Sequence, residues 1–161
     1  MNARAVVLSI RILALSVWVG GLIALGAIAA PLVFGNVPAP FSADAMTLVF
    51  RRFDRFAIVS GAILLACEGW WRAILPRASR IDLARVCATG VATALALLEG
   101  MWVSPKIAAL HAAHAVRGVG EAGMELEAIH RWAETIAKGE LVALVVVVVL
   151  TAWAVTPNRV D

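Results

Sequence analysis

Carboxylates within apolar stretches are the side chains of this sequence best suited to chemistry. Glu99 lies among three leucines with no basic residue within one helical turn, and Glu140 begins another apolar run. Because a charge is costly in lipid, such residues usually face a partner or a polar path. We therefore expect Glu99 to face the protein interior and, with Glu140, to relay a proton or cation. The alternative is that Glu99 pairs with Lys106 or Lys138 at the membrane surface.

Two other apolar stretches carry charges close to their ends. Arg11 lies about one helical turn into the first stretch, and its long side chain is expected to extend towards the lipid headgroups. Glu68 and Arg72 are four residues apart, so they share one face of a helix. They are predicted to form an ion pair within that helix, and as intramembrane charges they are also candidates for ion or proton handling.

Histidines provide a second kind of chemistry. His111 and His114 are three residues apart, and Glu127 precedes His130 by three, a spacing that places each pair on one helix face. We expect these four side chains and Glu140 to form one polar cluster that binds a divalent metal, since imidazole suits zinc, copper and iron. Di-iron sites need two such Glu-x-x-His motifs, and this chain has one. The alternatives are ordinary interfacial histidines or a haem site; no cofactor follows from the sequence.

Four apolar stretches are long enough to position these residues in a membrane: about 7–34, 56–75, 86–104 and 140–156. A membrane-spanning helix needs about 20 mostly apolar residues, and lipid forces backbone polar groups to pair within each segment. Hydrophobic residues make up 62% of the chain and charged residues only 16%. The sequence therefore predicts an all-α protein, a polytopic four-helix membrane bundle forming one integral membrane domain over residues 1–161.

The segment between the third and fourth stretches is more polar than its neighbours. Three glycines interrupt it, and after them Leu126, Ile129 and Ala133 recur at three- and four-residue spacing. That pattern predicts an amphipathic helix before the last span, which either lies along the membrane interface or folds back on the mouth of the bundle.

Basic residues indicate the topology. The short connection between the second and third stretches is rich in arginine: Arg72, Arg77, Arg80 and Arg85. Because Lys and Arg concentrate in short cytoplasmic loops, both termini are predicted to be cytoplasmic, in a bacterial inner membrane. The 14 basic and 11 acidic residues form no basic stripe, which argues against a nucleic-acid partner.

Small residues four positions apart are expected to bring the helices together, as Gly20 with Ala24 and Ala57 with Gly61. In lipid, small residues let helix backbones approach closely. The glycines expected at such contacts are Gly20, Gly21, Gly26, Gly61 and Gly90. Besides lipids, a second copy or a larger membrane complex would be the partner of such faces.

Short motifs resemble a known bacterial family. They are Trp18-Val19-Gly20-Gly21, Ala30-Pro31-Leu32-Val33-Phe34, Phe50-Arg51-Arg52-Phe53, Ser104-Pro105-Lys106-Ile107-Ala108-Ala109-Leu110 and His130. Together they resemble "domain of unknown function 4149", which is related to the eukaryotic transmembrane protein 205. The first motif also resembles copper-resistance protein D. The resemblance implies a four-span bundle and no particular activity.

Three functions are compatible with these features. The first is transport or handling of a cation or metal through polar residues in the outer half of the bundle. The second is an accessory or structural subunit of a larger membrane complex, with no chemistry of its own. The third is a haem- or metal-dependent redox protein, and only this one would make the chain an enzyme.

Overall fold

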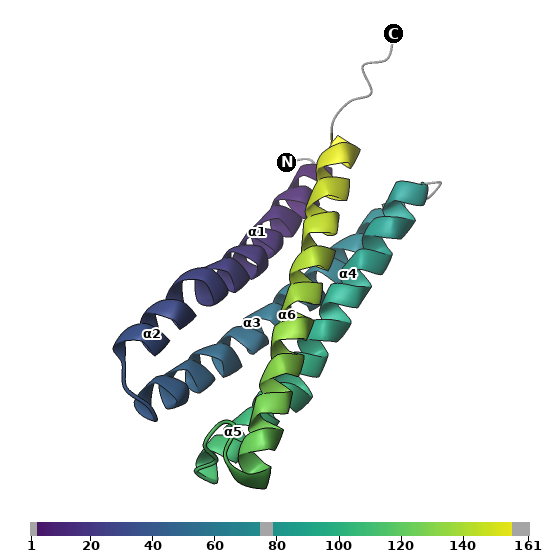
Figure 1. Cartoon of the computed structure of the whole chain (residues 1–161). Coiled ribbons are helices and arrows are strands. Elements are labelled where there is room, and N and C mark those ends of the chain that lie inside the picture. The colour runs from purple at the N-terminus through teal and green to yellow at the C-terminus, as the bar shows by residue number, and fades with distance from the viewer. Residues whose placement is uncertain (1–2, 75–78, 156–161) are drawn as a thin grey trace.

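The computed structural model describes residues 3–74 and 79–155, and all regular structure in these residues is helical (Figure 1). The elements are α1 (Ala3–Ile23), the π-helical segment η1 (Ala24–Ala29), α2 (Ala30–Asn36), α3 (Phe41–Ile74), α4 (Arg80–Leu98), the π-helical segment η2 (Glu99–Val103), α5 (Ser104–Ala112) and α6 (Gly120–Val155). Since η1 joins α1 to α2 and η2 joins α4 to α5, the chain forms four long helical rods.

The four rods alternate in direction (Figure 1). The start of α1, the end of α3, the start of α4 and the end of α6 lie at one end of the bundle, here called the terminal end. The connections at residues 37–40 and 113–119 lie at the other end, here called the loop end. The helix α3 packs against α1 and α4, and α4 packs against α6.

Three of the rods are long and apolar enough to cross a membrane: Ala3–Asn36, Arg80–Ala112 and Gly120–Ala154. By length and composition this chain is therefore a multi-pass membrane protein. The predicted span at residues 56–75 falls within α3 up to Ile74, and residue 75 lies outside the described residues; α3 is not among these three rods. That helix is 34 residues long and also contains the charged segment Arg51–Arg55.

The prediction of a separate interfacial helix before the last span is wrong, whereas the predicted amphipathic helix leading into that span is present. The helix α6 runs without interruption for 36 residues. Leu126 and Ile129 are 1% and 4% exposed, because they pack on Val103 and Ile107 of the preceding rod. The same apolar spacing that suits a membrane surface also suits a helix face buried in a bundle, and no proline divides the segment.

Both π-helical segments lie just before a proline, Pro31 or Pro105. A proline lacks the backbone N–H and crowds the carbonyl four residues earlier, and a π-helical turn relieves this by changing the local hydrogen-bond pattern. Glu99 is the first residue of η2. The irregular turn therefore coincides with the most isolated carboxylate of the sequence.

The glycine predictions are correct at two positions. A Cβ atom on Gly61 would lie 2.7 Å from Thr93 Oγ1 of α4, and one on Gly21 would collide with the ring of Phe53 in α3. These glycines therefore allow close helix contacts. By contrast, a Cβ atom on Gly20, Gly26 or Gly90 would meet nothing within 4 Å, so these glycines allow no close contact within the described part of the chain, and packing against another chain stays a prediction there.

Candidate functional site

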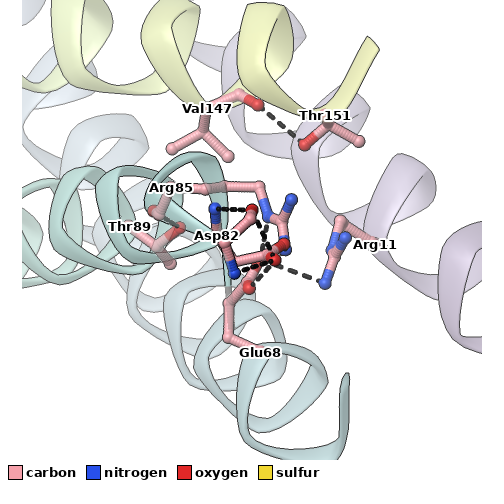
Figure 2. Close-up of polar contacts among 8 residues, drawn as sticks. Arg11, Glu68, Asp82, Arg85, Thr89, Val147 and Thr151 are labelled. Atoms are coloured by element: carbon pink, nitrogen blue, oxygen red, sulfur yellow. Dashed lines mark hydrogen bonds and ion pairs between the residues drawn. The ribbon is translucent and has the colours of Figure 1, made fainter. Parts of the chain in front are cut away.

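Four charged side chains form one buried group at the terminal end, here called the ion-pair cluster: Arg11, Glu68, Asp82 and Arg85. Arg85 donates from Nε and Nη2 to the two carboxylate oxygens of Glu68, at 2.7 and 3.0 Å. Arg11 Nη2 lies 3.0 Å from Glu68 Oε1, and Arg85 Nη2 lies 2.9 Å from Asp82 Oδ1. Figure 2 shows the two guanidinium groups on either side of the Glu68 carboxylate. The cluster thus joins α1, α3 and α4.

Local sequence explains how α4 presents its part of the cluster. Ser79 caps the helix, because its hydroxyl accepts from the N–H of Asp82 at 3.1 Å and the Asp82 carboxylate accepts from the N–H of Ser79 at 3.1 Å. Such a capping box fixes the first turn of a helix. Asp82 is therefore held where it accepts from Arg85, one turn further along.

Two predictions fail at the ion-pair cluster. Arg11 does not extend to the headgroups: it is 2% exposed, pairs with Glu68 and lies over the ring of Trp71 at 5.4 Å. Glu68 does not pair with Arg72, whose side chain is exposed. The reason is geometric, since Glu68 faces α1 and α4 while Arg72 lies on the outer side of α3.

A second group of acidic side chains, two buried and one half-buried, lines a cavity of about 1220 Å³ that is partly open to the outside. It consists of Asp54 of α3, Glu99 of η2 and Glu140 of α6, here called the carboxylate cluster. Ser104 Oγ donates to Asp54 Oδ2 at 2.6 Å, and the indole N–H of Trp18 donates to Glu140. Glu99 Oε2 is buried and accepts no hydrogen bond from any residue that the structure describes.

The prediction that Glu99 faces the interior is confirmed, because its side chain lines the cavity. The alternative partners are engaged elsewhere: Lys106 pairs with Glu125 at 2.7 Å and Lys138 with Glu134 at 2.6 Å. No ion pair within 4.0 Å joins the carboxylate cluster to a basic residue in the described part of the chain. The cluster therefore carries acidic groups that form no ion pair with the described basic residues.

The sequence predicts that Glu140 begins the last span; in the structure Glu140 lies near the middle of α6, twenty residues after Gly120. Its residue is 3% exposed. Asp54 and Glu99 also fall near the middle of their rods. Glu68, by contrast, is fourteen residues beyond Asp54 on α3, about 21 Å along the helix axis, and it does not line the cavity.

The predicted metal cluster is not assembled. His111 and His130 do meet, with ring centroids 5.8 Å apart, and His111 Nδ1 lies 3.0 Å from Thr47 Oγ1. Glu127, however, pairs with Arg131 at 3.3 Å, and Glu140 is ten residues from His130, about 15 Å along α6. Among residues 3–74 and 79–155 no group of three His, Cys, Asp or Glu side chains is placed to hold a metal ion.

His114 lies in the turn after α5, where its φ of 57° is left-handed. Its side chain is exposed at the loop end and lines the outer part of the cavity. The expected shared helix face with His111 therefore does not form, because α5 ends at Ala112.

Sequence reasoning missed Asp54, Ser104, Trp18 and Arg85 as members of these sites. Asp54 and Arg85 stand in arginine-rich segments that the hydropathy pattern treats as connections, although both lie inside long helices. A helical reading of residues 50–61 would have placed Asp54 on the same face as Ala57 and Gly61, at three- and four-residue spacing. That spacing was the available signal.

The fold and the buried charges define a small multi-pass helical membrane protein with an acidic cavity. The family model of the domain of unknown function DUF4149 matches residues 13–115, and the chain belongs to this family. The matched segment contains Asp54, Glu99 and Ser104, whereas Arg11 and Glu140 lie outside it. No curated protein and no solved structure matches the chain.

Proposed function

We propose that this protein binds a cation in its cavity through Asp54, Glu99 and Glu140, and handles or transports it in the membrane. The observation that carries the proposal is the buried, unpartnered Oε2 atom of Glu99, in a cavity shared with two other carboxylates. Like charges in one low-dielectric space repel one another, so such a cavity attracts protons or cations that neutralise it. Intramembrane carboxylates facing a cavity commonly mark ion pathways.

The position of the cavity supports a membrane-transport role. Residues of both loop-end connections line it, including Pro40 and Arg117, so the cavity extends from the middle of the rods to the loop end. With four spans and cytoplasmic termini, this end would face away from the cytoplasm. The helix α3 would then cross the membrane as well and bring the number of spans to four. Its 34 residues extend for about 51 Å, and it packs between α1 and α4.

Carbodiimide labelling tests the proposal. Dicyclohexylcarbodiimide is an apolar reagent that modifies carboxyl groups, and mass spectrometry locates the product. In protein reconstituted in lipid nanodiscs, we expect labelling of Glu99 that millimolar tetramethylammonium slows at fixed pH and ionic strength. Glu99→Gln should lose the product, whereas Glu125→Gln, at an exposed pair with Lys106 outside the cavity lining, should retain it. Labelling of Glu99 that neither sodium nor tetramethylammonium alters would contradict cation binding.

A second candidate function, an accessory or self-associating subunit, is favoured by one face of the first rod. Ser16, Gly20 and Ala24 are exposed at four-residue spacing, and a Cβ atom on Gly20 would meet nothing within 4 Å. Such small residues let a helix of another chain approach closely in lipid. If this face binds a second copy, Gly20→Leu should abolish cysteine cross-linking between copies carrying Ser16→Cys, whereas Gly90→Leu should not.

A further inference from the structure

The cavity differs in character along its length. On α6 five lining residues follow one face at three- and four-residue spacing, Leu126, His130, Ala133, Ala137 and Glu140, and Glu134 also lines the cavity beside them. Leu126 and Glu140 are fourteen residues apart, so this wall extends for about 21 Å. The carboxylate cluster lies at its inner end and the imidazoles of His111 and His130 lie towards the loop end.

The wall between the inner carboxylates and the loop end is mostly apolar. The lining side chains of this part include Leu25, Phe34, Met46, Phe50, Phe53 and Ile107, and its charged members are two of each sign: Asp44, Glu134, Arg51 and Arg117. The aromatic faces among them favour contact with a cation as well as with hydrocarbon. A bare inorganic ion would leave these walls without a partner.

The carboxylates themselves argue against a chelated metal. A divalent ion needs several oxygen ligands at roughly 2.0–2.6 Å, but no three acidic, imidazole or thiol groups in the described residues are placed to share one. A cation with its charge spread over a bulky head, by contrast, gains from several carboxylates at longer range. The cavity volume of about 1220 Å³ is also large enough for a drug-sized ligand, since pockets for such ligands have volumes of roughly 300–1,000 Å³.

We propose that the cavity binds an amphiphilic organic cation, with its ammonium-type head at Asp54, Glu99 and Glu140 and its apolar body along the walls towards the loop end. This inference rests on the proposed cation-binding function and names its ligand class. Charge complementarity fixes the orientation, because the unpartnered Glu99 oxygen lies at the inner end. The apolar body then occupies about 15 Å between the levels of Glu140 and His130.

Protection of Glu99 from dicyclohexylcarbodiimide separates the head from the body of the ligand. The probes are tetramethylammonium, octyltrimethylammonium below its micellar concentration and octanol, each added to the protein in nanodiscs. We expect octyltrimethylammonium to protect Glu99 at a concentration at least tenfold lower than tetramethylammonium, because its chain is buried against the walls. Octanol, which has no charge, should give no protection.

A pair of matched variants separates binding in the cavity from accumulation of the probe in lipid. Ala133 lines the middle of the cavity, so Ala133→Phe should remove the tenfold advantage of the octyl chain and leave protection by tetramethylammonium unchanged. Ala94 is exposed on α4, so Ala94→Phe should leave both unchanged. Unaltered tetramethylammonium protection also shows that the Ala133→Phe protein is folded.

The outcomes distinguish the two proposals. If neither sodium nor either ammonium protects Glu99, the cation-binding function itself fails and the inference fails with it. If sodium alone protects Glu99, cation binding stands and the organic ligand is overturned. If tetramethylammonium protects and the octyl compound is no better, cation binding stands and the amphiphilic ligand is overturned. Equal protection by octanol would overturn the inference in favour of a neutral lipid as the occupant.

Discussion

At the terminal end of the bundle Glu68 lies between two guanidinium groups, whereas at the cavity Glu99 shares its space with two other carboxylates. Both regions place ionisable groups between packed helical rods, and both contain residues that the sequence offered as candidates for ion handling. In the ion-pair cluster two cations and two anions balance, with Arg11 and Arg85 only 2% and 0% exposed. In the carboxylate cluster the described residues supply no cation within ion-pair distance.

This difference distinguishes a structural role from a binding role. Buried charges that neutralise one another leave no charge for a ligand, although Arg11 Nε and Arg85 Nη1 lack hydrogen-bond acceptors among the described residues. Buried charges of one sign need neutralisation from outside the protein. Intramembrane charge alone therefore does not identify a site; the sign of its nearest buried neighbours does.

The largest expected effect comes from removing the anion at the centre of the ion-pair cluster. Glu68→Ala leaves two buried guanidinium groups with only Asp82 as a counter-ion, and breaking a buried pair costs about 3–5 kcal/mol. We expect the free energy of unfolding to fall by this amount in detergent titrations. Arg72→Ala, at an exposed position on the same helix, should have little effect; equal losses in both variants would contradict the distinction.

The contact between α3 and α4 lies midway between the two regions, since Gly61 is seven residues from both Asp54 and Glu68. Gly61→Ala places a methyl group 2.7 Å from Thr93 Oγ1, and overpacking of this kind costs about 1–3 kcal/mol. Gly90→Ala, which meets nothing within 4 Å, should instead be neutral or raise stability by about 0.5–1 kcal/mol. Thermal unfolding of the two variants checks this contrast.

Removing a charge from the carboxylate cluster should lower cation affinity without lowering the stability of the fold. Glu99→Gln keeps the shape of the side chain and removes one of three like charges, so the free energy of unfolding should be retained or increased. Affinity for tetramethylammonium should fall at least tenfold, about 1.4 kcal/mol, measured by isothermal calorimetry in nanodiscs. A loss of stability comparable to that of Glu68→Ala would assign Glu99 a structural role.

The smallest effect is expected at the edge of the ion-pair cluster. Ser79→Ala removes the helix cap that holds Asp82, at a cost of about 1 kcal/mol. Because Glu68 still balances Arg85, affinity of the cavity for cations should not change. Detergent unfolding and calorimetry on the same preparation test both statements, and altered affinity would mean that the two regions are coupled.

The all-helical class, three of the apolar rods and the inward position of Glu99 could be predicted from the sequence. Hydropathy identifies these rods because lipid requires long apolar helices, and an isolated carboxylate among leucines has a high cost unless it faces inward. The lengths of α3 and α6 could not be predicted in the same way. Their charged or polar halves resemble connections in a hydropathy pattern, but they continue as helices because their partner helices cover them.

The sequence alone determined which residues are costly to expose to lipid, since that cost depends on the side chain and its near neighbours along the chain. It did not determine the partners. Glu68 faces Arg11 and Arg85, 57 residues before and 17 residues after it, rather than its helical neighbour Arg72. Asp54, Glu99 and Glu140 meet at one cavity only because three rods cross at similar depths. Long-range packing decides such pairings, because burial and charge neutralisation depend on distances in space and not on separation along the chain.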